Sequence, residues 1–334
     1  MRQLVFHGPR QLAVEEGAPR ALEKGEARIR VHSVGVCGSD VHGYAGVNAR
    51  RSPGMVMGHE AVGTVVELGQ DTGALAVGTP VAINPIVGCG VCRYCLAGDA
   101  NVCERRRIYG CVAVLPGAYA DEVVVRAINA VPFEGDVPVE WGALAEPLSV
   151  GARAARVGAI GTDDEVLVVG GGPIGLGAAL AARRRGARRV VVSEPLAHRR
   201  DVAEKLGLET LDPSSEDVPR AGVSVAVECV GHSPTLRAAL ESVVPQGRVV
   251  FVGLAEETIE LTPTPLMVGE RTIAGPSAYA DYDFRETVAW IASGTADLAP
   301  LIELRVDLDG LPEVFEAYAD GRLEAVKTLL QPTT

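Results

Sequence analysis

"VLVVGGGPIG", residues 166–175, joins a short apolar run to three regularly spaced glycines. The run Val166–Val169 is rich in β-branched residues and is typical of a buried parallel strand. Gly170, Gly172 and Gly175 follow it as G-x-G-x-x-G, and "LGAALAARRRGA" then predicts a helix that ends at Gly186. Between a strand and a helix, this pattern predicts a turn that binds a dinucleotide.

The turn and the strand that follows it indicate how the dinucleotide is bound and which one it is. Its glycines, with Pro173 and Ile174 between them, let the backbone approach a pyrophosphate at the helix N-terminus. Glu194 ends the next predicted strand, 188–195, where an acid would accept hydrogen bonds from the adenine ribose of NAD. Its charge disfavours NADP, although Arg199 and the arginine after it would lie close enough to meet a 2′-phosphate. The sequence therefore predicts NAD.

Strands and helices continue to alternate beyond this point. Further parallel strands are predicted at 223–231, 247–254 and 271–275, with a helix at 233–244 capped by Ser233. Repeated strand–helix units predict an α/β fold with a doubly wound parallel sheet.

A second decisive stretch is "GCGVCRYCLAGDANVC", residues 88–103, which holds Cys89, Cys92, Cys95 and Cys103. Four thiolates with short spacings fit a closed tetrahedral zinc site that holds structure and performs no chemistry. An iron–sulfur cluster fits less well, because its bacterial pattern has a three-residue last gap and a following proline. Unligated thiols at this density fit a cytosolic chain poorly.

Four further residues are candidate ligands of a catalytic zinc, namely Cys37, His59, Glu60 and Glu146. Catalytic zinc keeps three protein ligands and leaves one position for water or substrate. Each residue alone has an ordinary explanation, such as a small buried thiol for Cys37 or a surface charge for Glu60. Their scattered spacing does not establish a site by itself.

Three motifs resemble the zinc-dependent medium-chain dehydrogenase/reductase superfamily, and the resemblance extends over essentially the whole chain. "GHEAVG", residues 58–63, with Gly69 is similar to its zinc signature, and "CGSDVH", residues 37–42, is similar to the segment with its first catalytic ligand. The four-cysteine lobe has its structural-zinc spacing. The residues of these motifs and "EP" at 146–147 most resemble those of the polyol dehydrogenase branch, which includes sorbitol, butanediol and threonine dehydrogenases.

The resemblance implies roles for individual residues. Cys37 and His59 would ligate the catalytic zinc, and Glu60 and Glu146 would share the remaining role. Asp40 would orient His59, as carboxylates often do for metal-bound imidazoles. Ser39 and His42 would relay the substrate proton, whereas a turn cap and an exposed loop histidine are their ordinary explanations. Gly231 and Gly253 would end strands beside the nicotinamide.

The resemblance also implies the organisation and activity of the protein. Residues 1–147 and 283–334 would form a GroES-like, β-rich catalytic domain, and residues 148–282 a Rossmann cofactor domain, with the active site in the cleft between them. The expected reaction is zinc-dependent hydride transfer between a secondary alcohol and NAD, giving a ketone. The alcohol would be a polyol, vicinal diol, cyclitol or amino alcohol. Ala278 stands where polyol dehydrogenases often carry an arginine, which puts sorbitol in doubt.

Composition limits the partners of the chain. Its net charge of −12 disfavours nucleic acid, which is bound mainly through Lys and Arg. No signal peptide is visible, and the uncharged run 166–182 is broken by glycines and a proline, so a membrane is not expected. We expect a cytoplasmic protein. The resemblance to the dehydrogenase superfamily implies a homodimer or homotetramer with two zinc ions per chain.

Two rival functions make different demands on these residues. A zinc-free NADPH quinone or enone reductase on the same fold would lack both sets of candidate zinc ligands, and this chain has both. A non-catalytic nucleotide-binding scaffold would tolerate the loss of Cys37 or His59, and both are present.

Overall fold

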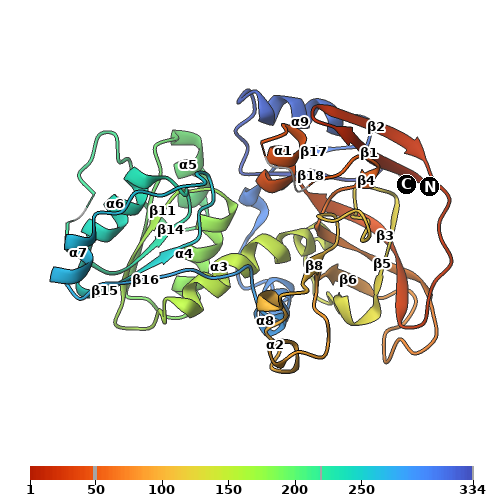
Figure 1. The fold of residues 1–334 in the computed structure, drawn as a ribbon, viewed down its shortest axis with the longest axis horizontal. Coiled ribbons are helices and arrows are strands. Elements are labelled where there is room, and N and C mark those ends of the chain that lie inside the picture. Colours follow the sequence, from red (N-terminus) through yellow and green to blue (C-terminus); the bar gives the residue numbers. More distant parts are fainter. Residues whose placement is uncertain (48–50, 219, 333–334) are drawn as a thin grey trace. The chain divides into compact units, whose positions relative to one another are not determined.

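The computed structural model describes residues 1–47, 51–218 and 220–332, which form two compact units (Figure 1). Unit 1 consists of Met1–Glu146 and Ala280–Thr334, and unit 2 of Pro147–Tyr279. Unit 1 is thus built from both ends of the chain, whereas unit 2 is one continuous segment.

Unit 1 is rich in β-structure. Its largest sheet has the order β10-β6-β5-β3-β18-β17, and β9 also pairs with β3. Smaller sheets join β2-β1-β4 and β7-β8. The strands of unit 1 are β1 (Arg2–Gly8), β2 (Gln11–Glu16), β3 (Glu26–Gly35), β4 (Met55–Val56), β5 (Glu60–Leu68), β6 (Pro80–Ile83), β7 (Ile86–Val87), β8 (Arg107–Ile108), β9 (Glu122–Arg126), β10 (Ala130–Pro132), β17 (Ile302–Val306) and β18 (Lys327–Leu330).

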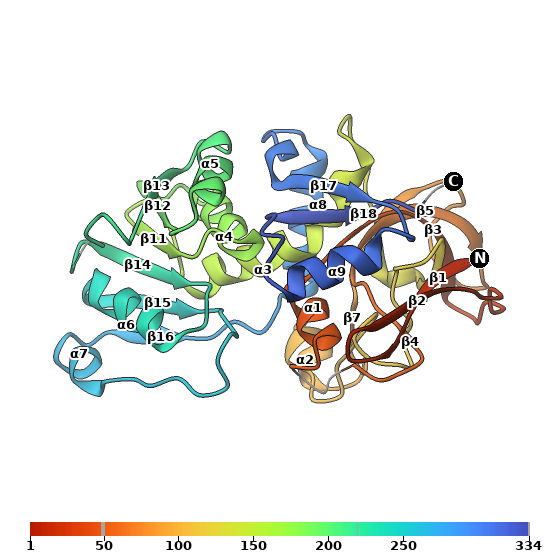
Figure 2. The same cartoon turned by 90° about the horizontal axis from the view of Figure 1, so that it is seen from above.

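Unit 1 also contains helices, most of them short. Figure 2 shows α1 beside α9, where Phe315 of α9 meets the ring of Tyr44 at a centroid distance of 5.5 Å. A buried apolar core, with Ile29, Val65 and Phe315 among its members, fills the unit. The helices of unit 1 are α1 (Gly38–Tyr44), α2 (Arg93–Leu96), η1 (Ala100–Val102), η2 (Ala127–Asn129), η3 (Val139–Leu144), α8 (Asp281–Ala292), η4 (Ala299–Leu301) and α9 (Leu311–Ala319).

Unit 2 contains a six-stranded sheet whose strands all run parallel, in the order β13-β12-β11-β14-β15-β16. The chain winds outward from β11 in both directions, so the order reverses between β11 and β14, and this confirms the predicted doubly wound sheet. Helices α4 and α6 pack on its strands. The elements are α3 (Ala145–Val157), which starts in unit 1, then β11 (Glu165–Val169), α4 (Pro173–Arg184), β12 (Arg189–Ser193), α5 (Ala197–Lys205), β13 (Glu209–Leu211), β14 (Val223–Glu228), α6 (Ser233–Ser242), β15 (Val243–Phe251), α7 (Pro263–Val268) and β16 (Thr272–Ala274).

Several predicted boundaries are wrong by a few residues. The helix expected at 233–244 ends at Ser242, because Val243 is already extended and opens β15. Pro245 lies two residues further on and pushes its neighbour Val244 away from helical geometry. The residue that caps this helix is His232 and not Ser233, whose hydroxyl instead bonds to Glu256.

Among the described residues, no helix combines the length and apolar character needed to cross a bilayer.

Candidate functional site

The four-cysteine lobe lies between β7 and β8. The sulfur atoms of Cys89, Cys92, Cys95 and Cys103 all lie within 4.8 Å of one another. Backbone N–H groups of Val91 and Cys92 lower the pKa of Cys89 to about 6, which favours the thiolate that metals bind. Among the described residues no His, Asp or Glu joins this group, so its donor chemistry fits a closed Zn²⁺ site.

The lobe is fastened to α8, which comes from the C-terminal part of the chain. The backbone N–H of Asp281 donates to the carbonyl of Gly98 at 3.3 Å, and the hydroxyl of Tyr282 donates to Asp99 at 3.3 Å. The lobe therefore ties two distant segments of unit 1 together.

The second metal-binding group is assembled by the pairing of β3 with β5. Their antiparallel register sets Gly35 opposite Glu60. Cys37 follows β3 by two residues and His59 immediately precedes β5, so this register brings both residues to the same end of the strand pair. Donor atoms of Cys37, His59 and Glu60 all lie within 4.8 Å of one another. A thiolate, an imidazole and a carboxylate are ligands that catalytic zinc takes, so the donor set fits the ion.

Glu146, the fourth predicted ligand, is not part of this group. It lies in the first turn of α3, half-buried, and its carboxylate is not within 4.8 Å of all three other donors. Three of the four predicted catalytic ligands thus come together in the structure, and the role of Glu146 stays a prediction.

A buried carboxylate orients His59. Asp40 Oδ2 lies 3.3 Å from His59 Nδ1, while Asp40 Oδ1 accepts a hydrogen bond of 2.7 Å from Arg51. The Tyr119 hydroxyl also donates to Asp40, at 3.0 Å. Burial raises the pKa of Asp40, but the adjacent cations outweigh burial and hold it below its usual value. An ionised Asp40 thus fixes the ring on its Nδ1 side, which leaves Nε2 for a metal.

The same neighbours affect the charge of His59. Burial lowers the pKa of His59, but Asp40 and two neighbouring thiols more than offset burial and hold the pKa well above 6.5. Metals bind the neutral imidazole, so a metal ion at this group competes with that proton.

Sequence reasoning missed three residues at this group. Lys327, the first residue of β18, donates from Nζ to Glu60 Oε2 at 2.6 Å. The Arg51 guanidinium pairs with Asp40, and the Cys111 sulfur lies 3.9 Å from His59 Nδ1. The one available signal was Lys327, a lone charge within the apolar strand-like run "AVKTLL", residues 325–330.

The two predicted relay residues, Ser39 and His42, both lie on α1. Ser39 is exposed and its hydroxyl donates to the Cys37 sulfur at 3.3 Å. His42 is also exposed on the same helix. The structure thus brings Ser39 to the metal group, whereas the step from Ser39 to His42 stays a prediction.

In unit 2 the predicted glycine turn joins β11 to α4. Gly172 caps the helix, Pro173 is its first residue and Ile174 follows. A Cβ at Gly175 would lie 1.8 Å from the Gly170 carbonyl oxygen, so only glycine permits the turn to close on the helix. The N–H groups at the start of α4 therefore lie at the carboxyl end of β11, where doubly wound sheets bind nucleotides.

Glu194 lies immediately after β12 and is buried beside this turn. Its Oε2 accepts a hydrogen bond of 2.7 Å from the Gly171 N–H, and its Oε1 accepts one of 2.9 Å from the Leu196 N–H. Arg200 is held by the Glu194 carbonyl and by Asp212, at 2.8 and 3.2 Å. Arg199 is half-buried, and its Nε has no hydrogen-bond partner among the described residues.

Gly231 and Gly253 meet beyond the ends of β14 and β15. A Cβ at Gly253 would lie 2.0 Å from the Gly231 nitrogen, so the two loops are in direct contact. Buried Glu228 accepts hydrogen bonds from the N–H groups of Val230 and Gly231 and from the Thr235 hydroxyl. The predicted cofactor glycines thus gather at the carboxyl ends of adjacent parallel strands.

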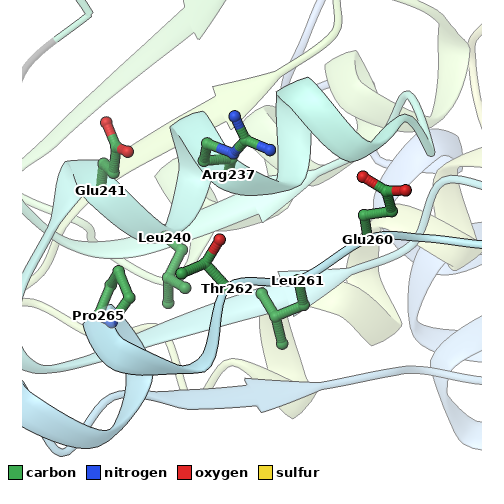
Figure 3. Close-up of a pocket in the computed structure, with 7 residues that line it drawn as sticks. All are labelled: Arg237, Leu240, Glu241, Glu260, Leu261, Thr262 and Pro265. Atoms are coloured by element: carbon green, nitrogen blue, oxygen red, sulfur yellow. The ribbon is translucent and has the colours of Figure 1, made fainter.

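A separate pocket of about 210 Å³ lies between α6 and the segment 260–265 (Figure 3). Figure 3 shows Arg237 and Glu241 on the helix and Glu260 on the facing segment. None of the residues predicted for catalysis or cofactor binding lines this pocket. Its lining residues are Arg237, Leu240, Glu241, Glu260, Leu261, Thr262 and Pro265.

Comparison with known proteins agrees with this arrangement. Residues 23–135 match the family model of the alcohol dehydrogenase GroES-like domain, and residues 173–293 match that of the zinc-binding dehydrogenase. The L-galactonate-5-dehydrogenase of Escherichia coli (strain K12) is 32% identical over 338 residues, which cover 99% of this chain and 98% of the relative. The chain belongs to the zinc-dependent medium-chain dehydrogenase/reductase superfamily.

Solved structures show the same fold as this dehydrogenase. The 2R,3R-butanediol dehydrogenase from Bacillus subtilis has a TM-score of 0.90 and 29% identity, and the match covers 99% of both chains. A zinc-binding dehydrogenase from Sinorhizobium meliloti 1021, bound to NADP, has a TM-score of 0.91 and 27% identity, again with 99% of both chains covered. The predicted GroES-like and Rossmann folds, and membership of a family of alcohol-oxidising enzymes, are therefore confirmed.

Proposed function

We propose that this dehydrogenase transfers a hydride between a secondary alcohol and NAD and produces a ketone. The observation that carries this proposal is the group of half-buried Cys37 with buried His59 and Glu60. Its donor set fits catalytic zinc, and the same chain has a nucleotide-binding turn. The resemblance to L-galactonate-5-dehydrogenase and butanediol dehydrogenase favours a hydroxyl within a polyol, a sugar acid or a diol. Cyclitols and amino alcohols remain members of the proposed substrate class.

The residues of unit 1 would hold two zinc ions per chain. Cys89, Cys92, Cys95 and Cys103 would bind the structural ion, and Cys37 and His59 the catalytic one, with Glu60 and Glu146 sharing the remaining position. When bound, the catalytic zinc supplies a Lewis acid that polarises the alcohol oxygen and makes its proton more acidic.

The protein itself would fix the ligands and remove the proton. Asp40 holds His59 in one orientation through Nδ1, which keeps the donor set arranged before substrate binds. Ser39, 3.3 Å from the Cys37 sulfur, would accept the substrate proton and pass it to the exposed His42. Because His42 is in contact with water, the proton would leave the site there.

We propose NAD as the preferred cofactor, which would bind at the turn 170–175, at Glu194 and at the loops of Gly231 and Gly253. A buried carboxylate at the end of β12 repels a 2′-phosphate and accepts hydrogen bonds from ribose hydroxyls. Arg200, one of the two cations near Glu194, is already paired with Asp212. The NADP in the Sinorhizobium meliloti structure makes a direct measurement necessary.

Glu194→Ala tests this preference. Removing the carboxylate should lower the ratio of kcat/KM for NAD to kcat/KM for NADP by about tenfold or more. The reason is that the repulsion between the carboxylate and the 2′-phosphate of NADP is lost. Asp201→Ala, which removes an exposed acid from α5, is the matched control and should leave the ratio unchanged. An unchanged ratio in Glu194→Ala would contradict the ribose role.

Cys37→Ser tests the proposed function as a whole. The variant should lose turnover of secondary alcohols and fall from two metal ions per chain to one, while NAD binding to unit 2 persists. Cys229→Ser, which alters a half-buried thiol outside both metal groups, should keep both ions. Turnover in Cys37→Ser with an unchanged metal count would remove this group from catalysis.

The wild-type metal content separates the rival functions. One ion per chain favours a non-catalytic scaffold that kept only the cysteine lobe, and none favours a zinc-free quinone or enone reductase. Activity across a panel of secondary alcohols, sugar acids and diols then identifies the substrate.

We further propose that the protein works as a homodimer or homotetramer in the cytoplasm. No cysteine forms a disulfide among the residues that the structure describes, as expected in a reducing compartment. Sedimentation of the purified protein would give its oligomeric state.

A further inference from the structure

An exposed glutamate in the loop after β15 bonds to the start of α6. Glu256 Oε2 accepts hydrogen bonds from the Ser233 N–H at 3.0 Å and from the Ser233 hydroxyl at 2.9 Å. Its Oε1 lies 3.0 Å from His232 Nδ1. The Glu256 N–H donates to the Gly231 carbonyl, also at 3.0 Å. One residue thus connects the loop that follows β15 to the loop that precedes α6.

The Ser233 hydroxyl strengthens this connection. It donates to Glu256 and accepts a hydrogen bond of 3.0 Å from the Glu260 N–H, so two points of the segment 252–260 bond to one residue of α6. The Ser233 hydroxyl and N–H, together with His232, hold the pKa of Glu256 below its usual value, which favours the carboxylate. A negative charge at a helix N-terminus is also favoured by the helix dipole.

These loops adjoin the nucleotide-binding turn. A Cβ at Gly170 would lie 2.9 Å from a methyl group of Val230, and a Cβ at Gly253 would lie 2.0 Å from the Gly231 nitrogen. The turn after β11, the loop after β14 and the loop after β15 therefore pack against one another at the carboxyl ends of adjacent strands. Doubly wound sheets bind nucleotides at this edge. A displacement of the loop after β15 would thus alter the surface that a dinucleotide meets.

Fold stability does not explain the contact. Glu256 and His232 are both exposed, and exposed ion pairs contribute little to the free energy of unfolding. The segment 252–260 lies outside every helix and strand, and loops of this kind open readily unless specific contacts hold them. The main effect of the contact is therefore on the conformation of the loop.

We propose that Glu256 is a positioning residue that holds the loop after β15 in the conformation that binds the dinucleotide. The inference rests on the proposed function, which places a cofactor at the loops of Gly231 and Gly253. Without the carboxylate the loop would occupy several conformations. The apparent affinity for the cofactor would then fall in proportion to the fraction of molecules that keep the binding conformation.

The test measures the binding of NADH to the full-length protein by fluorescence titration. In Glu256→Ala the Kd should rise about tenfold, because fewer molecules hold the loop in place. At saturating NAD, kcat should stay within about twofold of wild type, because bound cofactor selects the same loop conformation. The free energy of unfolding should not change. Glu257→Ala, which removes the adjacent exposed acid of the same loop, is the matched control and should keep the wild-type Kd.

A double-mutant cycle shows whether Glu256 acts through α6. Ser233→Ala removes the hydroxyl that bonds to both Glu256 and Glu260, and it should raise the Kd for NADH about threefold. The double variant should bind NADH as Glu256→Ala does, within about twofold, because both changes break the same contact. Effects that multiply would show that Glu256 acts independently of Ser233, and they would overturn the proposal.

The remaining outcomes are also decisive. An unchanged Kd in either single variant, or a higher Kd accompanied by a loss of stability, would overturn the positioning role. If the wild type binds NADPH alone, the same comparison is made with NADPH. A wild-type protein that binds neither cofactor would instead contradict the proposed function, so the two failures are distinguishable.

Discussion

At the scale of residues, the two buried acids at the proposed catalytic metal group are each paired with a buried cation. Asp40 is matched by Arg51, and Glu60 is matched by Lys327. A buried charge without a partner costs several kcal/mol, so each acid that serves the group requires a cation close by. The sequence predicted the acids from their motifs, but nothing near them in the chain identified Lys327 as a partner.

Asp40→Asn should weaken the catalytic metal site selectively. Loss of the negative charge leaves His59 without its anionic partner, and removal of such partners lowers metal affinity by about 10–100-fold. Dialysis against a chelator should therefore leave about one ion per chain, held by the cysteine lobe. Asp121→Asn, an acid that bonds to the backbone N–H of Arg2, is the control and should keep both ions. Retention of both ions by Asp40→Asn would contradict the orienting role.

At the scale of elements, register decides which side chains meet. The pairing of Gly35 with Glu60 brings Cys37 and His59 to one end of the β3–β5 pair. Because side chains alternate between the two faces of a strand, a slip of one residue would move Glu60 to the other face. The motifs predicted these ligands, but they did not predict the register that brings three of them together. Glu146, on α3, lies outside that strand pair and outside the group.

Two glycines of the turn 170–175 should respond differently to replacement by alanine. In Gly175→Ala the new methyl group would meet the Gly170 carbonyl, so we expect a loss of about 1–3 kcal/mol in the free energy of unfolding. In Gly172→Ala the methyl group meets nothing within 4 Å, so stability should be unchanged while NAD binding weakens. Denaturant unfolding and NAD titration measure the two effects. Equal stability of both variants would contradict the packing argument.

At the scale of the whole molecule, the two units differ in how the chain completes them. Unit 2 is continuous, so its sheet forms from local strand–helix units. Unit 1 needs both ends of the chain, because β18 lies between β3 and β17 in its largest sheet. The same strand carries Lys327 to Glu60, so completing the sheet also completes the charge environment of the metal group.

Truncation before Lys327 should unfold unit 1 and spare unit 2. Without β18, strands β3 and β17 lose their shared neighbour, and their exposed backbone groups lose hydrogen bonds. Limited proteolysis should then leave a resistant fragment close to residues 147–279. A chain that ends at Pro332 is the control and should resist cleavage throughout. Survival of unit 1 in the shorter chain would show that β18 is dispensable.

The sequence by itself determined the features that depend on neighbours in the chain. The glycine turn and the cysteine lobe each lie within one short segment, where spacing fixes geometry, and the strand–helix alternation is built from consecutive local units. Only the tertiary structure decided the pairing of Lys327 with Glu60, the pairing of Arg51 with Asp40 and the approach of Cys111 to His59. The Lys327 contact depends on the return of the C-terminal strand, and the other two depend on loops that bring Arg51 and Cys111 to the group from outside the strands. A buried lysine looks the same in a sequence as an exposed one.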